Sequence, residues 1–297
     1  MPKVSIVVAT YRREESLVIA LNSLSNQTYD NIEIVLVDDN DDKMWNDKVK
    51  RIVDNFKEEN KNIDINCIIN HPNKGSAKAR NAGIEVAKGD YITFLDDDDL
   101  YLQEKVENQL NNMLANDADY SITDLYLYNE DNKLVDKRIR SYIKKYDKNS
   151  LLEYHLMNHM TGTDTLMFKK DYLLKIGMFD DIDIGDEFYL MLKAIDENGK
   201  LCYVPICDVK AFVHTGENGL SSGKNKIDGE NQLFEFKKKY FPSLSKKSIR
   251  YIKMRHHAVL AVAYSKINKK ILFFKEAIYS FIISPKCCIK LLLNSKN

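Results

Sequence analysis

Short apolar runs alternate with segments of helical periodicity over the first 118 residues of this 297-residue chain. The apolar runs lie at residues 4–10, 32–39, 63–70 and 91–96. The segment after the first run repeats apolar residues at the spacing of one helix face, as at Leu17, Leu21 and Leu24. Strands that alternate with helices in this way form βαβ units, whose parallel sheet is buried on both faces. The sequence therefore predicts an α/β fold with a mostly parallel sheet flanked by helices.

The alternation breaks after about residue 119. Residues 119–140 predict two strands around a polar turn at Asn129–Asn132, which indicates an antiparallel addition to the sheet. The next elements predicted are a helix near 149–158, a strand in 163–170, a helix over 186–199, and two short strands at 200–206 and 209–214. From about residue 227 the pattern is helical. We expect a first domain over 1–240, with halves of about 1–118 and 119–240, and a helical extension over 241–297.

The balanced composition hides a charge asymmetry. The chain has 44 basic and 44 acidic residues, yet residues 237–297 contain 15 Lys or Arg and a single acidic residue, Glu276. This segment carries +14, so the first 236 residues carry −14. Helices with a basic and an apolar face lie on anionic membranes, so residues 245–297 predict peripheral membrane contact. The alternative is a helical cap that packs on the first domain. No nucleic-acid recognition motif is present, and we expect no nucleic-acid partner.

Polar residues follow three of the four predicted strands, at 10–12, 38–39 and 96–99. Ligands of open parallel sheets bind outside the carboxyl ends of the strands. The four adjacent aspartates at 96–99 repel one another, and Mg²⁺ or Mn²⁺ would offset that repulsion, since these hard cations take carboxylate and phosphate oxygens. Asp96 and Asp98 would point the same way if the strand continued. The alternative is a solvated acidic turn in which Asp99 caps the next helix.

Two stretches resemble the inverting family 2 glycosyltransferases of GT-A fold: "PKVSIVVATYRREESLVIALNSLSNQTYDNIEIVLVDDN" (2–40) and "NKGSAKARNAGIEVAKGDYITFLDDDD" (73–99). The similarity is close over about 2–115 and looser over 160–215. It implies transfer of a sugar, with inversion, from a nucleotide-sugar such as a UDP-sugar to a glycan or lipid-linked saccharide acceptor. It also implies dependence on Mn²⁺ or Mg²⁺ and a place in polysaccharide biosynthesis.

The same resemblance implies roles for residues at the first, second and fourth strand ends. Asp39 and Tyr11 match the positions that hold the base and ribose of the donor, and Arg80 matches a basic residue near the nucleotide. Asp96 and Asp98 match the D-x-D signature, in which the last aspartate binds the metal.

Five further positions carry implied or open roles. Asp97 fills the variable place of the signature, so the resemblance allows it to share the role of Asp96 or that of Asp98. Asp38 is expected only to cap or brace its loop. Thr10 and Arg12 belong to the first-strand motif, with an N-cap and a solvated charge as their alternatives. Gly162 resembles the loop near the donor sugar.

His214 resembles a C-terminal histidine that helps to hold the metal or diphosphate. A structural role is the alternative for this single histidine.

Inversion requires a carboxylate that deprotonates the acceptor hydroxyl, while a cation takes up charge on the leaving diphosphate. The segment "FDDIDIGDEFYLMLK" (179–193) resembles the "ED" motif that precedes a helix in this family. The family pattern has a leucine three residues after the base, and Leu190 lies three residues after Glu187, so the resemblance favours Glu187 as the base. Asp186 remains a second candidate, and two helix-terminal charges without a chemical role are the alternative.

Two other functions compete with sugar transfer. A sugar-phosphate nucleotidyltransferase should have a glycine-rich loop after the first strand, but "ATYRREES" contains no glycine. A non-catalytic nucleotide- or glycan-binding module would not need the set of carboxylates. The N-terminus does not resemble a signal peptide and no run of about 18 apolar residues occurs, so we expect a cytoplasmic enzyme, peripheral on the inner face of the plasma membrane.

Overall fold

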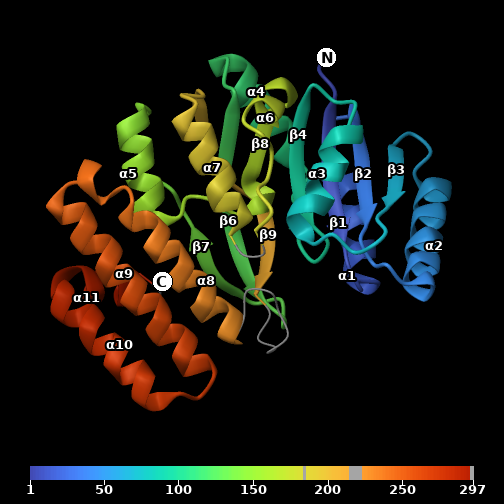
Figure 1. Cartoon of the computed structure of the whole chain (residues 1–297). Coiled ribbons are helices and arrows are strands. Elements are labelled where there is room, and N and C mark those ends of the chain that lie inside the picture. Colours follow the sequence, from blue (N-terminus) through green and yellow to red (C-terminus); the bar gives the residue numbers. More distant parts are fainter. Residues whose placement is uncertain (183–184, 214–222, 295–297) are drawn as a thin grey trace. The chain divides into compact units, whose positions relative to one another are not determined.

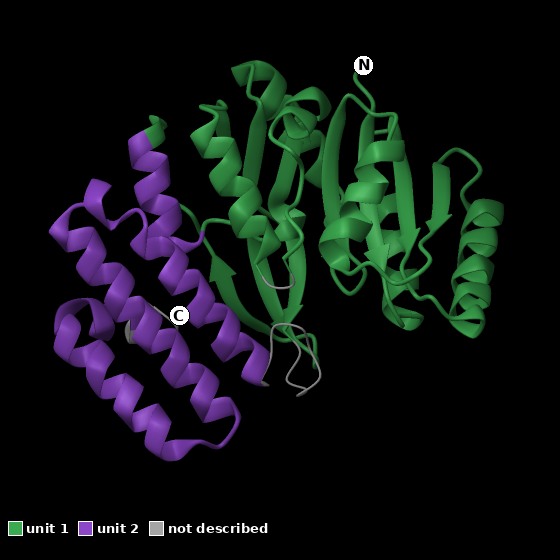
Figure 2. Cartoon of the chain, viewed as in Figure 1, with its two compact units in different colours: residues 1–148, 160–213 green, residues 149–159, 214–297 purple. Residues whose placement is uncertain are grey.

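The structure, a computed structural model, describes residues 1–182, 185–213 and 223–294. The chain divides into two compact units (Figure 2), of which one comprises residues 1–148 and 160–213 and the other residues 149–159 and 214–297. Compactness alone does not show which residues fold independently. The predicted domain boundary near residue 240 therefore stays a prediction.

The first unit contains a sheet with the strand order β3-β2-β1-β4-β8-β6-β9-β5, in which β7 also pairs with β6 (Figure 1). The strands are β1 (Val4–Thr10), β2 (Ile32–Asp38), β3 (Asp64–Ile69), β4 (Tyr91–Asp96), β5 (Leu100–Tyr101), β6 (Tyr120–Asn129), β7 (Leu134–Arg138), β8 (Leu166–Lys169) and β9 (Leu201–Val213). The helices of this unit are α1 (Glu15–Ser25), α2 (Lys43–Glu59), α3 (Ser76–Val86), α4 (Lys105–Asn116), α6 (Lys170–Lys175) and α7 (Asp186–Asp196). Strands β3, β2, β1 and β4 run parallel, and β8 joins β4 and β6 in antiparallel fashion. The predicted α/β fold is confirmed, and so is the antiparallel β6–β7 hairpin.

Helices cover both faces of the parallel strands. Val4, Ile6 and Val8 of β1 belong to a buried cluster that also contains apolar residues of α1, α2 and α4. The intervening Val7 faces α3, where a Cβ atom added to Gly83 would lie 2.5 Å from Val7 Cγ1. Such a contact is shorter than real Cβ atoms make, so glycine lets α3 pack directly against β1.

The two short strands expected at 200–206 and 209–214 form one strand, β9, instead. The register of β9 against β6 shifts between Val204 and Cys207. Pro205 lies in this interval and has no N–H group to donate to the ladder. The chain accommodates it in a bulge and continues the strand, whereas the sequence suggested a break.

The second unit is helical over the residues that the structure describes. Its helices are α5 (Lys148–Asn158), α8 (Gly223–Lys238), α9 (Lys246–Lys266), α10 (Lys270–Ile283) and α11 (Pro285–Asn294). Ser245 caps α9 by accepting a hydrogen bond from the Ser248 N–H. The predicted helical C-terminal region is confirmed. Among the described helices, none is long and apolar enough to cross a bilayer.

Lys105, the first residue of α4, lies in the core of the first unit with no exposed surface. Its ammonium group donates hydrogen bonds to Thr93 Oγ1 at 2.6 Å and to the Tyr101 hydroxyl at 2.9 Å. Burial lowers the pKa of Lys105 to about 7, although the carboxylates of Asp208 and Asp164 oppose this shift. The lysine thus ties β4, β5 and α4 together at an electrostatic cost.

Replacing Lys105 with methionine should change how stability depends on pH. The unfolded chain keeps this ammonium protonated up to a pKa of about 10.5, whereas the folded chain releases the proton near a pKa of about 7. Between these values the unfolded state binds more protons, so the contribution of Lys105 to the free energy of unfolding rises with pH, by at most about 1.4 kcal/mol per unit. In urea titrations, the free energy of unfolding of the wild type relative to that of Lys105→Met should be larger at about pH 9 than at about pH 7. An equal difference at both values would contradict this account.

Candidate active site

The four aspartates after β4 are held by residues of α3, of the segment at the end of β1, and of β9. Strand β4 ends at Asp96, and a turn follows in which the Asp99 N–H donates to the Asp96 carbonyl at 3.1 Å. The strand does not continue, so the condition for Asp96 and Asp98 to share one direction is not met. The Asp96 carboxylate accepts a hydrogen bond from Arg80 Nη2 of α3 at 2.7 Å.

Asp97 and Asp98 contact the segment that follows β1. Asp97 Oδ2 accepts hydrogen bonds from Thr10 Oγ1 at 2.7 Å and from the Tyr11 N–H at 3.2 Å. Burial, and then the neighbouring Asp98, raises the pKa of Asp97 to about 7. Asp98 Oδ2 pairs with Arg13 Nη2 at 2.9 Å. These contacts bring the ends of β1 and β4 together at one edge of the sheet.

Asp99 points into the protein. It is buried and accepts a hydrogen bond from the Phe212 N–H of β9 at 2.8 Å. It also shares a side-chain hydrogen bond with Asp164, from the short 3₁₀ helix η1 (Thr163–Thr165). The cap residue of α4 is Glu104. The alternative in which Asp99 caps a helix from a solvated turn is therefore wrong.

Asp96, Asp99 and Asp164 form a cluster in which one carboxylate oxygen from each lies within 4.8 Å of the others. Burial, followed by the charge of Asp164, raises the pKa of Asp99 well above its usual value. Burial and then Asp96 raise the pKa of Asp164 to about 7. Crowded carboxylates need a proton or a cation to offset their repulsion, and oxygen ligands suit Mg²⁺ and Mn²⁺. These residues therefore fit a divalent cation.

Arg80 connects the β4 end to the start of α7. Its Nη1 donates to Asp186 Oδ2 at 2.7 Å, while its Nη2 holds Asp96. The guanidinium is buried and lies 5.5 Å from the centre of the Phe179 ring. Burial lowers the pKa of Arg80, but the attraction of Asp96 and Asp186 outweighs it and raises the pKa. One arginine thus bridges two carboxylates that are far apart in the sequence.

The two acidic residues at the start of α7 have different surroundings. Both oxygens of the buried Asp186 accept hydrogen bonds, Oδ2 from Arg80 and Oδ1 from the Glu187 N–H at 2.9 Å. Burial raises the pKa of Asp186 to about 7, although Arg80 opposes the shift. Glu187 is only partly buried. Of the two, Glu187 is the more accessible to an acceptor.

The aspartates at the end of β2 shape the loops around it. The buried Asp39 carboxylate accepts hydrogen bonds from Asn70 Nδ2 at 2.9 Å and from the N–H groups of Lys74 and Gly75 at 3.0 and 2.9 Å. It therefore fixes the loop that leads into α3. Asp38 accepts hydrogen bonds from the side chains of Asn40 and Asn46, both at 2.7 Å.

Tyr11 presents a half-exposed ring beside these loops. The Arg12 guanidinium carbon lies 5.2 Å from the centre of that ring. The backbone of Arg12 is left-handed, with φ 53°, and its N–H donates to Asn40 Oδ1 at 2.6 Å. An exposed aromatic ring at this edge offers a flat surface on which a base can stack.

Comparison with known proteins identifies the family. Residues 5–173, more than half of the chain, match the family described as Glycosyl transferase family 2. The chain belongs to this family. An uncharacterized glycosyltransferase of Haemophilus influenzae is 32% identical over 233 residues, 76% of this chain and 84% of that protein. An Escherichia coli protein named UDP-Glc:alpha-D-GlcNAc-diphosphoundecaprenol beta-1,3-glucosyltransferase WfaP is 28% identical over 269 residues, 90% and 94% of the two chains.

Two solved structures share the fold of this family 2 enzyme. The S. aureus TarS 1–349 complex with UDP-GlcNAc has a TM-score of 0.60 at 16% identity and covers 94% of this chain and 91% of its own. The mannosyltransferase PcManGT from Pyrobaculum calidifontis, in complex with GDP-Man and Mn²⁺, has a TM-score of 0.64 at 16% identity, with 99% and 84% covered. At this identity the likeness shows the fold alone, which confirms the predicted GT-A architecture. Family membership favours the glycosyltransferase over the nucleotidyltransferase and the binding module.

The parallel register explains why most residues predicted for this family 2 site meet. Thr10 is paired with Asp38, and Ala9 with Asp96, so the ends of β1, β2 and β4 lie level. Gly162 is the cap residue of η1, two residues before Asp164. His214 lies outside the described residues. The roles predicted for these residues stay predictions.

Sequence reasoning missed two residues that the structure brings to this site. Asp164 lies in "TGTDT", from which only Gly162 was selected, and its Oδ1 accepts the Asp96 N–H at 2.7 Å. Arg13 follows the selected Arg12 and pairs with Asp98. No local signal marks either residue, since each is recognised only through a partner from another element.

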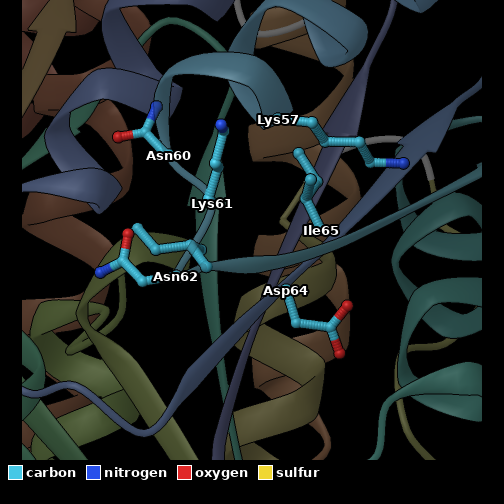
Figure 3. Close-up of a pocket in the computed structure, with 7 residues that line it drawn as sticks. Lys57, Asn60, Lys61, Asn62, Asp64 and Ile65 are labelled. Atoms are coloured by element: carbon cyan, nitrogen blue, oxygen red, sulfur yellow. The ribbon is translucent and has the colours of Figure 1, made fainter.

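A separate hollow lies at the opposite end of β3, between the end of α2 and the start of the strand (Figure 3). It is lined by Lys57, Asn60, Lys61, Asn62, Ile63, Asp64 and Ile65. None of the predicted site residues lines it. Since ligands of parallel sheets bind at the carboxyl ends of the strands, we assign it no role in the reaction.

Removing the Arg80 bridge should destabilise the protein strongly. Arg80→Met leaves Asp186 buried without its cation, which is expected to lower the free energy of unfolding by about 3–5 kcal/mol. Lys78→Met on the same helix is the matched control, because Lys78 pairs with Asp181 at 2.6 Å but both side chains are mostly exposed. The control should cost about 1 kcal/mol or less. Urea unfolding compares the two, and equal losses would contradict the bridging role of Arg80.

Proposed function

We propose that this enzyme transfers a sugar, with inversion, from a UDP-sugar to a lipid-linked saccharide, and that it requires a divalent cation. The observation that carries the proposal is that Arg80 donates hydrogen bonds to both Asp96 and Asp186. The carboxylates proposed to bind the cation therefore lie near the acidic pair at the start of α7. The names of two Escherichia coli relatives, WfaP and WfgD, support the donor and acceptor classes, since both contain UDP-Glc and alpha-D-GlcNAc-diphosphoundecaprenol.

The donor would bind at the carboxyl ends of β1, β2 and β4. Tyr11 supplies an exposed ring for the base, and Arg12 lies beside it. Asp39 and Thr10 would act through the loops that they hold. Asp97, whose Oδ2 accepts hydrogen bonds from the β1 end, would position that end against the nucleotide.

The cation would be Mn²⁺ or Mg²⁺, held by Asp98 and Asp96 with help from His214. The cluster of Asp96, Asp99 and Asp164 offers a second set of ligands in the same region. When bound, the cation would take up negative charge on the leaving diphosphate.

Binding of UDP should depend on this cation. Calorimetry with Mn²⁺ and with a chelator should show UDP affinity falling about 10- to 100-fold without metal, and Asp98→Asn should remove that difference. Asp54→Asn, on the exposed side of α2, is the control and should behave as wild type.

Asp164→Asn tests the second set of ligands in the same assay. If it removes the metal dependence while Asp98→Asn does not, the cation lies in the three-carboxylate cluster. UDP affinity that is identical with and without chelator would contradict the metal proposal altogether.

Glu187 is the proposed base. Both oxygens of Asp186 are engaged, so Asp186 is suited to hold Arg80, whereas Glu187 occupies the first turn of α7 with greater exposure. A carboxylate there is stabilised by the helix dipole and can accept the proton of the acceptor hydroxyl.

Glu187→Gln should lower turnover about 10²- to 10⁴-fold, the usual range for loss of a general base, and leave UDP-sugar affinity nearly unchanged. Asp186→Asn is the informative neighbour, because it should lower the melting temperature as well as turnover by weakening the Arg80 bridge. Transfer assays and thermal unfolding of both variants distinguish the roles. If neither variant slows transfer, the base lies elsewhere.

A lipid-linked acceptor lies at a membrane, so we propose that the enzyme is cytoplasmic and peripheral on the inner face of the plasma membrane. The charge of +14 over residues 237–297 supports contact with anionic lipid.

A further inference from the structure

Helix α10 exposes large apolar side chains to solvent and buries two polar ones. Its exposed side carries large apolar side chains, which we call the α10 face: Ile271, Phe274, Ile278, Phe281 and Ile282. Ile271 is 85% exposed and Ile282 65% exposed. Their spacing of three and four residues places them along one side of the helix. An exposed apolar stripe of this size marks an interaction surface.

The two buried residues of α10 are polar. Glu276 is buried and its Oε2 lies 2.6 Å from His257 Nδ1 of α9. Ser280 is buried as well and donates a hydrogen bond to the Met254 carbonyl at 3.0 Å. Helices α9 and α10 lie side by side within the second unit (Figure 1). These contacts fix which side of α10 faces outward, so the apolar side cannot turn inward without breaking them.

The charge around the α10 face selects its partner. Lys270 and Lys275 of α10 and Lys286 and Lys290 of α11 are exposed. Residues 237–297 contain 15 basic residues and one acidic residue, Glu276, which is buried. A second copy docked on the same face would bring together two segments that each carry a formal charge of +14, whereas an anionic lipid surface complements the charge.

We propose that the α10 face inserts into the headgroup region of an anionic bilayer while the surrounding lysines contact the lipid phosphates. A helix that exposes Phe and Ile beside Lys has the composition of an interfacial helix. This inference rests on the proposed function only in that the lipid-linked acceptor would be met at the same surface. The binding itself requires no catalysis.

The test is sedimentation of the full chain with vesicles of phosphatidylglycerol and phosphatidylcholine, and with phosphatidylcholine alone. The wild type should bind the anionic vesicles at low salt, bind the neutral ones at least about tenfold more weakly, and dissociate as salt rises. The double variant Phe274→Ser/Ile278→Ser should lose at least about tenfold in binding. Val18→Ser/Ile19→Ser, which removes two exposed apolar side chains from α1, is the matched control and should bind as wild type.

Three outcomes would overturn the inference: no binding to either vesicle, equal binding to both, or an α10 variant that binds as well as the control. Self-association in sedimentation velocity that the α10 variant abolishes, without vesicle binding, would assign the face to a second copy. UDP-sugar hydrolysis by the same samples separates this inference from the proposed function. Hydrolysis without vesicle binding refutes only the inference, and vesicle binding without transfer or hydrolysis refutes only the proposed function.

Discussion

The repulsion among four adjacent carboxylates is the constraint on which the site depends. Three parts of the chain stabilise the aspartates: Arg80 of α3 holds Asp96, the segment at the end of β1 holds Asp97 and Asp98, and the backbone of β9 holds Asp99. The turn after β4 is therefore the point where the first unit is tied together. A sheet with another strand order would leave these charges without partners, so the acidic run and the topology require each other.

Arg80 extends this arrangement from the end of β4 to the start of α7. It is buried, it holds Asp96 and Asp186 at 2.7 Å each, and its own charge is stabilised by both. A guanidinium suits this task because its planar fork can address two carboxylates at once, which an ammonium group cannot do with fixed geometry. Asp186 is consequently committed to Arg80, and its neighbour Glu187 is the residue better placed for proton transfer.

The second unit follows a different physical logic. Its helix α10 buries Glu276 and Ser280 and exposes Ile271, Phe274 and Ile278, the opposite of what water favours. This pattern is favourable only if the exposed apolar side of α10 is removed from water by a binding partner. The basic composition of residues 237–297 then serves association with an anionic surface, while the acidic first 236 residues contain the site.

The sequence by itself determined the βαβ order, the positions of β1, β2 and β4, and hence the edge at which Asp39, Asp96 and Asp98 gather, because hydrophobic periodicity is local. Only the tertiary structure decided which charges meet. Asp164 reaches Asp96 from 68 residues away and Arg80 reaches Asp186 from 106 residues away, since β8 inserts beside β4 and α7 begins near α3. Such contacts depend on strand order and register, which no local pattern encodes. For the same reason the sequence left open a helix cap for Asp99, which the fold buries against β9.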